Sequence, residues 1–237
     1  MIDEALKFAD VSAVTRGVDV GCGIGGSSRY IAKKFGASME AVTLSPRQAS
    51  RGNELSASAG LGDKVHLQVA NALDMPFDDG SFDLVWSMES GEHMPEKPRF
   101  VGELCRVCAP GGRIIVVTWC HRDLAPGETS LSWDEQLILD RISDAYYLPK
   151  WCSVADYKAL FEEEGFEDVR TADWSDEVSW FWLAVIGTAL TPAGFAGVLR
   201  AGPMTLQGAL VMPLMQLGYR RGVIKFGAIT ARRPSAS

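Results

Sequence analysis

A glycine-rich segment follows a short apolar run near the start of the chain: Gly17-Val18-Asp19-Val20-Gly21-Cys22-Gly23-Ile24-Gly25-Gly26. The apolar run predicts a buried strand, and residues 26–35 have the spacing of a helix that ends at Gly36. Because glycines carry no Cβ, the connecting backbone can turn sharply and approach a ligand closely. A strand, a glycine-rich turn and a helix in this order are typical of the cofactor site in α/β proteins.

Strand and helix signals alternate on both sides of this segment. Apolar spacing at residues 2, 5, 6 and 9 predicts an N-terminal helix. Ser45 and Pro46 predict the start of another helix, with Gln48 closing a capping box. A further helix is expected over residues 98–108, and Pro110-Gly111-Gly112 separates it from the next strand. The expected strands cover residues 17–20, 41–44, 65–70, 82–87, 113–118 and 223–230. This alternation predicts a doubly wound α/β fold with helices on both faces of a parallel sheet.

The composition is that of a globular protein. The chain has 237 residues, of which 47% are hydrophobic and 22% charged, so it fits one large α/β domain and not a disordered chain. With a net charge of −7 and no Lys/Arg cluster, nucleic acid is not an expected partner. Five cysteines, an odd number, are typical of reduced thiols in an intracellular protein, and the first nine residues lack the pattern of a signal peptide.

The second half of the chain contains a long segment with almost no charge. Between Val178 and Tyr219 the only charged residue is Arg200. Prolines and glycines interrupt the segment, which disfavours a membrane-spanning helix of about 20 residues. Three alternatives remain: short helices packed over the sheet, an apolar wall or lid that also contacts a membrane surface, and a transmembrane helix.

The glycine spacing and a nearby carboxylate indicate which ligand the turn favours. The pattern G-x-G-x-G-G differs from the G-x-G-x-x-G of dinucleotide enzymes, and Asp19 lies two residues before Gly21. A carboxylate there disfavours a pyrophosphate and favours a ligand that carries an ammonium and a sulfonium group. The alternative is a glycine-rich turn that binds no ligand.

Polar residues follow the second and third predicted strands, at the sheet edge that carries the ligand in open α/β folds. After the second strand, Gln48 either contacts a ribose together with Thr43 or only caps the helix. After the third strand, Asn71 either accepts a hydrogen bond from an adenine amine or only forms a turn.

Acid–base residues follow the fourth and fifth predicted strands. Glu89 and Glu92 lie close to His93, and we expect the two carboxylates to raise the pKa of the imidazole and make it a usable base. The alternative for His93 is a loop cap. After the fifth strand, His121 and Asp123 form either a second acid–base pair or a loop hydrogen bond.

Three further reactive side chains are assigned to packing or to the surface. Cys105 and Cys108 lie in the expected helix without a second Cys/His pair at ligand spacing, so no metal site is predicted. His66 lies within a strand and is predicted to be a surface or cross-strand residue.

These motifs resemble those of a known family. The glycine-rich turn, residues 76–85 and Pro110-Gly111-Gly112 are similar to the class I S-adenosylmethionine-dependent methyltransferases. The gamma-tocopherol C-methyltransferases of plants, algae and cyanobacteria are the more specific match. The resemblance to them covers nearly the whole chain and is carried by residues 18–30, 43–46, 85–94, 117–126, 147–157, 211–215 and 222–226.

The resemblance implies a fold and a reaction. The fold is a doubly wound, mostly parallel seven-stranded sheet of the Rossmann-like class I type, with a helical apolar lid inserted before the last strand. One methyltransferase domain spans residues 1–237, with a cofactor-binding half (10–130), a substrate-side or lid region (131–221) and the last strand (222–230). The reaction moves a methyl group from S-adenosylmethionine to a ring carbon of a small hydrophobic phenol, turning gamma-tocopherol into alpha-tocopherol and delta-tocopherol into beta-tocopherol.

Site residues follow from the resemblance together with the strand-end positions. His93 is expected to act as the base, supported by Glu89 and Glu92. Asn71 stands where the family usually has Asp, which predicts weakened cofactor binding. The residues expected to bind the cofactor are Asp19, Gly21, Cys22, Gly23, Gly25, Gly26, Thr43, Leu44, Ser45, Gln48, Asn71, Ala72, Ser87 and Met88.

The resemblance also bears on the start of the chain and on its location in the cell. The family usually has some tens of residues before the position of Met1, and its eukaryotic members a transit peptide; without them we expect a weakly active chain. The expected location is the plastid, or the cytoplasm of a cyanobacterium. The alternatives are an N-methyltransferase for an indole alkaloid, a quinol-ring methyltransferase, and a non-catalytic cofactor-binding protein. The sequence does not indicate an oligomeric state.

Overall fold

The structure is a computed structural model that describes residues 1–189, 191, 194, 197, 200 and 202–235. Contacts between residues divide the chain into two compact units. Unit 1 consists of residues 1–118, 155–172 and 228–237, and unit 2 of residues 119–154 and 173–227.

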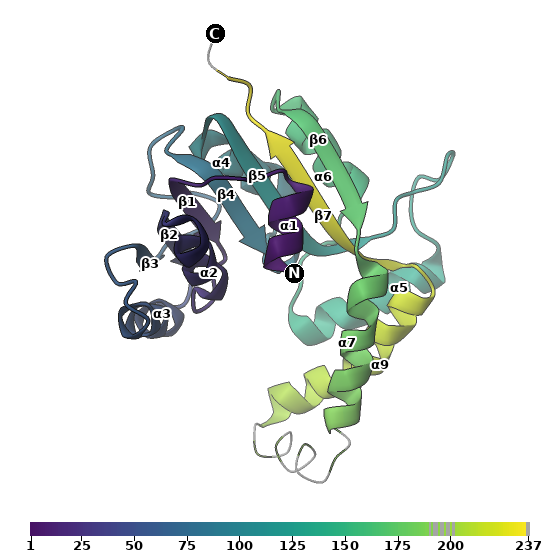
Figure 1. Cartoon of the computed structure of the whole chain (residues 1–237). Helices are drawn as coiled ribbons and strands as arrows, with labels where there is room; N and C mark the ends of the chain where they lie inside the picture. Colours follow the sequence, from purple (N-terminus) through teal and green to yellow (C-terminus); the bar gives the residue numbers. More distant parts are fainter. Residues whose placement is uncertain (190, 192–193, 195–196, 198–199, 201, 236–237) are drawn as a thin grey trace. The chain divides into compact units, whose positions relative to one another are not determined.

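One seven-stranded sheet runs through the fold, in the order β3-β2-β1-β4-β5-β7-β6 (Figure 1). The strands β1 to β5 pair in parallel, which confirms the mostly parallel sheet. Strand β7 runs opposite to β5, because Gly111 and Gly112 bond to Arg233 while Thr230 bonds to the Ile114 carbonyl oxygen. The strand bounds are β1 (Arg16–Val20), β2 (Ser38–Thr43), β3 (Val65–Val69), β4 (Phe82–Met88), β5 (Cys108–His121), β6 (Glu167–Asp173) and β7 (Ile224–Arg232).

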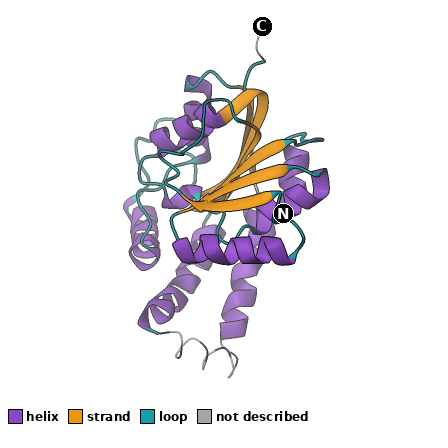
Figure 2. Ribbon diagram, turned by 90° about the vertical axis from the view of Figure 1, so that its left-hand side faces the viewer, coloured by secondary structure: helices purple, strands orange, loops and turns teal. Residues whose placement is uncertain are grey.

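Helices lie on both sides of the sheet (Figure 2), as the alternating signals predict. The helices that belong to unit 1 are α1 (Ile2–Phe8), α2 (Gly26–Phe35), α3 (Pro46–Ser58), α4 (Lys97–Val107) and nearly all of α6 (Val154–Glu163). Helix α2 begins and ends at the predicted residues, because glycines in the left-handed conformation flank it at both ends. A short 3-10 turn, η1 (Gly91–His93), follows β4.

Most predicted boundaries differ from the observed ones by a few residues, and two of the differences change how a segment is described. Strand β2 ends at Thr43, so Leu44 lies beyond it and is 74% exposed. Pro110-Gly111-Gly112 does not separate a helix from a strand; these residues lie inside β5, where the register against β4 shifts. Phe82 and Leu84 of β4 pair with Cys108 and Arg113, so β5 has three extra residues here, an irregularity that glycines accommodate. Cys108 is therefore the first residue of β5 and not a mid-helix residue.

Unit 2 contains the helices α5 (Trp133–Tyr146), α7 (Ser175–Ala189) and α9 (Pro203–Arg220). Helix α9 packs against both α5 and α7. The predicted apolar segment 178–219 forms much of α7 and α9, but residues 190, 192–193, 195–196, 198–199 and 201 lie outside the described residues. Within the described part of the chain, no helix is both long enough and apolar enough to cross a membrane.

Candidate active site

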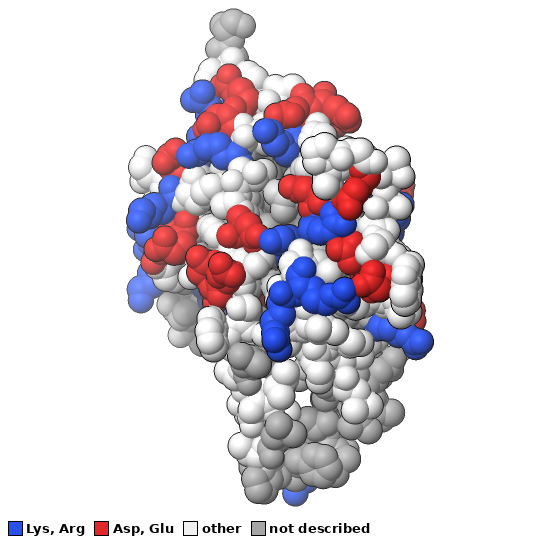
Figure 3. All heavy atoms as spheres, turned by 90° about the vertical axis from the view of Figure 1, so that its right-hand side faces the viewer, with Lys and Arg blue, Asp and Glu red and all other residues white. Residues whose placement is uncertain are grey.

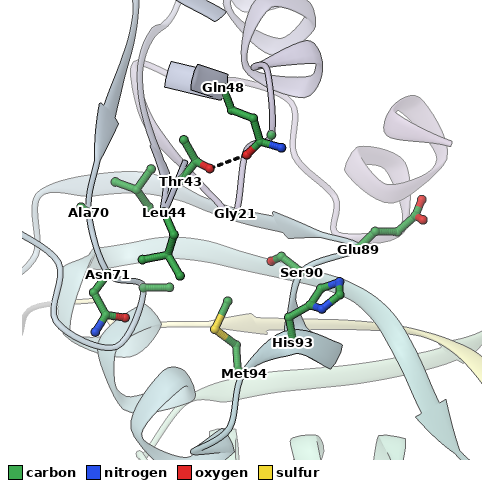
Figure 4. Close-up of a pocket in the computed structure, with 13 residues that line it drawn as sticks. Gly21, Thr43, Leu44, Gln48, Ala70, Asn71, Glu89, Ser90, His93 and Met94 are labelled. Atoms are coloured by element: carbon green, nitrogen blue, oxygen red, sulfur yellow. Dashed lines mark hydrogen bonds between the residues drawn. The ribbon is translucent and has the colours of Figure 1, made fainter. Parts of the chain in front are cut away.

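A cavity of about 430 Å³ opens where β1 to β4 end, entirely within unit 1 (Figure 4). Since these four strands are parallel, their carboxyl ends meet at one edge of the sheet, and the loops that follow them surround the space. The cavity is lined by Gly21, Gly23, Val42, Thr43, Leu44, Gln48, Ala70, Asn71, Ala72, Glu89, Ser90, His93 and Met94.

The glycine-rich turn forms one wall of the cavity. The surroundings of two of its glycines, Gly21 and Gly23, differ. Gly21 has a φ of +82°, and a Cβ there would lie 2.2 Å from the Cβ of Ser90. Gly23 has a φ of +54°, and a Cβ there would meet no atom within 4 Å. The backbone at Gly21 therefore packs closely on Ser90, whereas the space beside Gly23 is free for a ligand. The predicted close approach of a ligand to the backbone therefore has room at Gly23.

Thr43 and Gln48 form a polar pair on the next wall. The hydroxyl of Thr43 donates to Gln48 Oε1 over 2.7 Å, shown as the dashed line in Figure 4. Ser45 is the N-cap of α3, because its hydroxyl accepts from the Gln48 backbone N–H. The predicted capping box is only half formed: the backbone N–H of Ser45 bonds to Thr43 Oγ1, and the Gln48 side chain bonds to Thr43. Both side chains line the cavity, so they remain the candidates for binding ribose hydroxyls.

Asn71 also lines the cavity, and its side chain stabilises a turn. Its Oδ1 accepts a hydrogen bond of 3.0 Å from the backbone N–H of Leu73. Because a carbonyl oxygen has two lone pairs, this turn bond leaves one site for an adenine amine. The two alternatives for Asn71 are therefore compatible with each other.

We expect Asn71→Asp to strengthen cofactor binding about fivefold. A carboxylate keeps the Leu73 bond with one oxygen and offers the second oxygen to the adenine amine, and charged acceptors form stronger hydrogen bonds than neutral ones. Isothermal titration calorimetry with S-adenosylmethionine measures the change, with Asn71→Ala as the variant that loses both bonds. An affinity of Asn71→Asp equal to or below that of the parent chain would show that Asn71 serves the turn alone.

Several predicted cofactor residues do not line the cavity. Asp19 is 3% exposed and accepts a hydrogen bond of 2.6 Å from the Ser28 hydroxyl in α2. Burial raises the pKa of Asp19 to about 6. Its carboxylate thus connects β1 to α2 and does not face the ligand space. The other predicted residues outside the cavity lining are Cys22, Gly25, Gly26, Ser45, Ser87 and Met88.

His93 lies at the cavity edge, where it comes from η1. Contrary to the sequence-based expectation, its pKa lies below the usual value, because burial disfavours the imidazolium and the ammonium group of Lys97 repels it. Figure 4 shows the carboxylate of Glu89 pointing away from the His93 ring. Among the described residues, the ring has no hydrogen-bond partner. His93 is therefore a neutral imidazole near pH 7, which is the form that accepts a proton.

Glu92 belongs to η1, but its side chain is buried and does not line the cavity. It is 6% exposed, and its Oε2 accepts a hydrogen bond of 2.6 Å from the Thr118 hydroxyl. Burial raises its pKa to about 7. Glu92 was predicted to support His93, but its carboxylate bonds to Thr118 instead and so connects the turn to β5.

The other two histidines have structural partners. His121 lies in unit 2, where its Nδ1 donates to the Arg122 carbonyl oxygen over 2.7 Å and its backbone bridges to Ser153. His66 is exposed and pairs with Glu40 on the neighbouring strand, as predicted. Cys105 is buried in α4, in agreement with a packing role.

Four lining residues were not predicted: Val42, Ala70, Ser90 and Met94. Val42 and Ala70 lie beside predicted residues at the ends of β2 and β3, so the strand-end rule applied to neighbours would have found them. Ser90 and Met94 flank η1, a turn of three residues with no periodic signal in the sequence.

Comparisons with known proteins show what this chain is similar to. A family model for a methyltransferase domain matches residues 18–116. A protein of Oryza sativa subsp. japonica named "Probable tocopherol O-methyltransferase, chloroplastic" is 59% identical over 100% of this chain and 67% of its own length. The tocopherol O-methyltransferase of Arabidopsis thaliana, also named chloroplastic, is 57% identical over 99% of this chain and 69% of its own length.

Solved structures show the same fold at lower identity. A geranyl diphosphate C-methyltransferase from Streptomyces coelicolor A3(2), solved with S-adenosyl-L-homocysteine, superposes with a TM-score of 0.79. The match covers 97% of this chain and 76% of that protein, at 24% identity. The chain belongs to the tocopherol O-methyltransferase family and is a class I S-adenosylmethionine-dependent methyltransferase.

Proposed function

We propose that this enzyme methylates a ring carbon of a phytyl-tailed chromanol, turning gamma-tocopherol into alpha-tocopherol and delta-tocopherol into beta-tocopherol. The observation that carries the proposal is the identity of 57–59% to tocopherol methyltransferases over almost the whole chain. A neutral imidazole at the edge of the cofactor cavity supports it, since a phenol needs a base before its ring carbon becomes a good nucleophile.

The residues of the cavity divide the work between binding and proton transfer. The backbone at Gly21 and Gly23 holds the methionyl part of the cofactor, and Thr43 with Gln48 holds its ribose. When bound, S-adenosylmethionine supplies an electrophilic methyl group on a sulfonium. His93 accepts the proton of the phenolic hydroxyl, whose pKa of about 10 resembles that of tyrosine. The ring carbon would gain the methyl group as the sulfur–methyl bond breaks, with S-adenosylhomocysteine as the coproduct. Its hydrogen would then leave as a proton while the phenolic oxygen takes one up, so the aromatic phenol is restored and one proton is released overall.

Methylation at carbon and at oxygen are both open to a deprotonated phenol. The names of the two plant relatives specify methylation at oxygen. A base that removes the phenolic proton raises electron density at the ring carbons beside the oxygen as well as at the oxygen itself. We assign the transfer to carbon, and the position of the new methyl group in the product distinguishes the two.

Peripheral membrane contact and a plastid location belong to the same proposal. On the face shown in Figure 3, charged side chains are mixed over most of the surface and scarce where α7 and α9 lie. Trp180 in α7 and Leu210 in α9 are each 71% exposed, which suits a surface that meets the lipid in which a phytyl-tailed substrate dissolves. Both plant relatives are named chloroplastic, and we propose the plastid for this enzyme.

A panel of methyl acceptors tests the proposed substrate class. Methyl-labelled S-adenosylmethionine is incubated in parallel with gamma-tocopherol, delta-tocopherol, a phytyl hydroquinone and an indole amine. We expect both tocopherols to be labelled much faster than the other two. Faster labelling of the indole amine would support the N-methyltransferase alternative, and no labelling of any acceptor despite cofactor binding would support a non-catalytic protein.

A further inference from the structure

A buried lysine holds the turn that carries His93. Lys97 is the first residue of α4 and is only 8% exposed. Lysine is disfavoured at the first turn of a helix, because the helix dipole places partial positive charge there. Its burial at this position calls for a strong compensating interaction.

Three backbone carbonyl oxygens provide that interaction. Lys97 Nζ donates to Gly91 O over 2.8 Å, to Glu92 O over 3.1 Å and to Met94 O over 2.7 Å. An ammonium group has three N–H donors, so it can serve all three oxygens at once. All three acceptors belong to η1 and the residue that follows it, which is the turn that presents His93 and Met94 to the cavity.

The same turn is fixed at two other points. Before it, the Ser90 hydroxyl donates to the Val20 carbonyl oxygen over 2.9 Å and so joins the turn to β1. Within it, the Glu92 side chain accepts a hydrogen bond from the Thr118 hydroxyl of β5. Of these three connections, only that of Lys97 involves several carbonyl oxygens at once. It joins the turn to helix α4, whereas the other two join it to β1 and β5.

We propose that Lys97 is a positioning residue for methyl transfer: its ammonium group fixes the turn that sets His93 and Met94 against the methyl acceptor. The proposal rests on the proposed function, in which His93 receives the phenolic proton. The charge of Lys97 also favours the neutral imidazole that accepts the proton. It opposes protonation of His93, while Glu89 and Glu92 are the carboxylates closest to His93 in the chain.

The test compares Lys97→Met with the parent enzyme and with Lys64→Met. Methionine has nearly the length of lysine but no charge and no donor. Lys64 is an exposed lysine whose Nζ also donates to a carbonyl oxygen, that of Gly36, so its variant controls for the loss of such a bond away from the cavity. Turnover is measured with whichever acceptor of the panel the parent methylates, so that failure of the tocopherol assignment does not affect this test.

We expect kcat of Lys97→Met to fall about ten- to hundredfold, because a shift of about 1 Å in a positioned group has effects of this size. The cofactor Kd should stay within about twofold of the parent value, since Lys97 does not line the cavity. The His93 imidazole should titrate at higher pH, as followed by its NMR resonance; the chain has three histidines, so assignment needs only single variants. Lys64→Met should match the parent in all three measurements.

A role for Lys97 in fold stability alone gives a different result. Lys97→Met would then melt at lower temperature, while kcat per folded enzyme and the His93 titration stay at parent values, and this would overturn the proposal. If Lys97→Met does not fold, Lys97→Gln replaces it, because an amide still donates to two of the three oxygens and lacks the charge. An unchanged kcat and an unchanged His93 titration in Lys97→Gln would equally overturn it.

Discussion

Replacing His93 with alanine is expected to lower the single-turnover rate of methyl transfer by about two to four orders of magnitude, the usual contribution of a general base. His93 lines the cavity and has no hydrogen-bond partner among the described residues, so its ring is available to the acceptor. Cofactor affinity should barely change, because the cofactor contacts are assigned to the glycine-rich turn and to the ends of β2 and β3.

The rate of the parent enzyme should also depend on pH in a defined direction. The neutral imidazole is the active form, so the rate rises with pH through the pKa of His93. Burial and Lys97 lower that pKa, so the midpoint should lie below the ordinary histidine value of about 6.5. A pH–rate profile of single turnovers measures it, and His93→Ala should abolish this dependence.

His66→Ala and His121→Ala are the matched controls for the base. His66 pairs with Glu40 on the surface, and its removal should leave the rate unchanged. His121 donates through Nδ1 to a backbone oxygen and was the other candidate base. A large loss of rate in His121→Ala with a normal rate in His93→Ala would move the base to the end of β5. Normal rates in both variants would mean that positioning alone accounts for catalysis.

Gly23→Val should weaken cofactor binding by more than tenfold. Gly23 has room for a side chain only in the ligand space, so valine would occupy the place of the methionyl group. Gly60→Val is the control, because Gly60 also has positive φ (+69°) and no atom within 4 Å of its Cβ, yet lies outside the cavity. Both variants carry the same kind of backbone strain, so a difference in Kd reports the cavity alone.

Calorimetry of both glycine variants decides this prediction. Equal cofactor affinity in folded Gly23→Val and Gly60→Val would show that the turn does not hold the cofactor. Gly21→Val is unsuitable for the purpose, because its side chain would collide with Ser90 and disturb the site whether or not a ligand binds there.

Local signals explain which parts of the fold were predictable. The segment from β1 to α2 has strong local determinants, an apolar run and left-handed glycines at both ends of the helix, and the structure matches it nearly residue by residue. Strand β6 has no such signal. Its sequence Glu167-Asp168-Val169-Arg170-Thr171-Ala172-Asp173 is polar, and it lies at the sheet edge with most residues exposed or half-buried. Only the resemblance to a seven-stranded family indicated this strand.

The site residues likewise fall into those that the sequence predicts and those that it does not. Residues at strand ends, such as Thr43, Asn71 and His93, could be grouped from the sequence because parallel strands bring their carboxyl ends together. The direction of the side chains in η1 could not be predicted from the sequence, because a single 3-10 turn has no periodicity to follow. The sequence suggested that Glu92 faces His93, whereas it turns toward Thr118. The lowered pKa of His93 depends on Lys97, whose ammonium turns back onto its own preceding loop.

The position of the transferred methyl group shows whether this enzyme methylates the chromanol ring at carbon. The enzyme is incubated with gamma-tocopherol and S-adenosylmethionine carrying a ¹³C-methyl group, and the product is examined by NMR and mass spectrometry. We expect the label to appear as a methyl group on the aromatic ring, in a product that keeps a free phenolic hydroxyl and is identical to alpha-tocopherol. Label in a methoxy group on the phenolic oxygen, or no labelled chromanol while an amine is labelled, would contradict it.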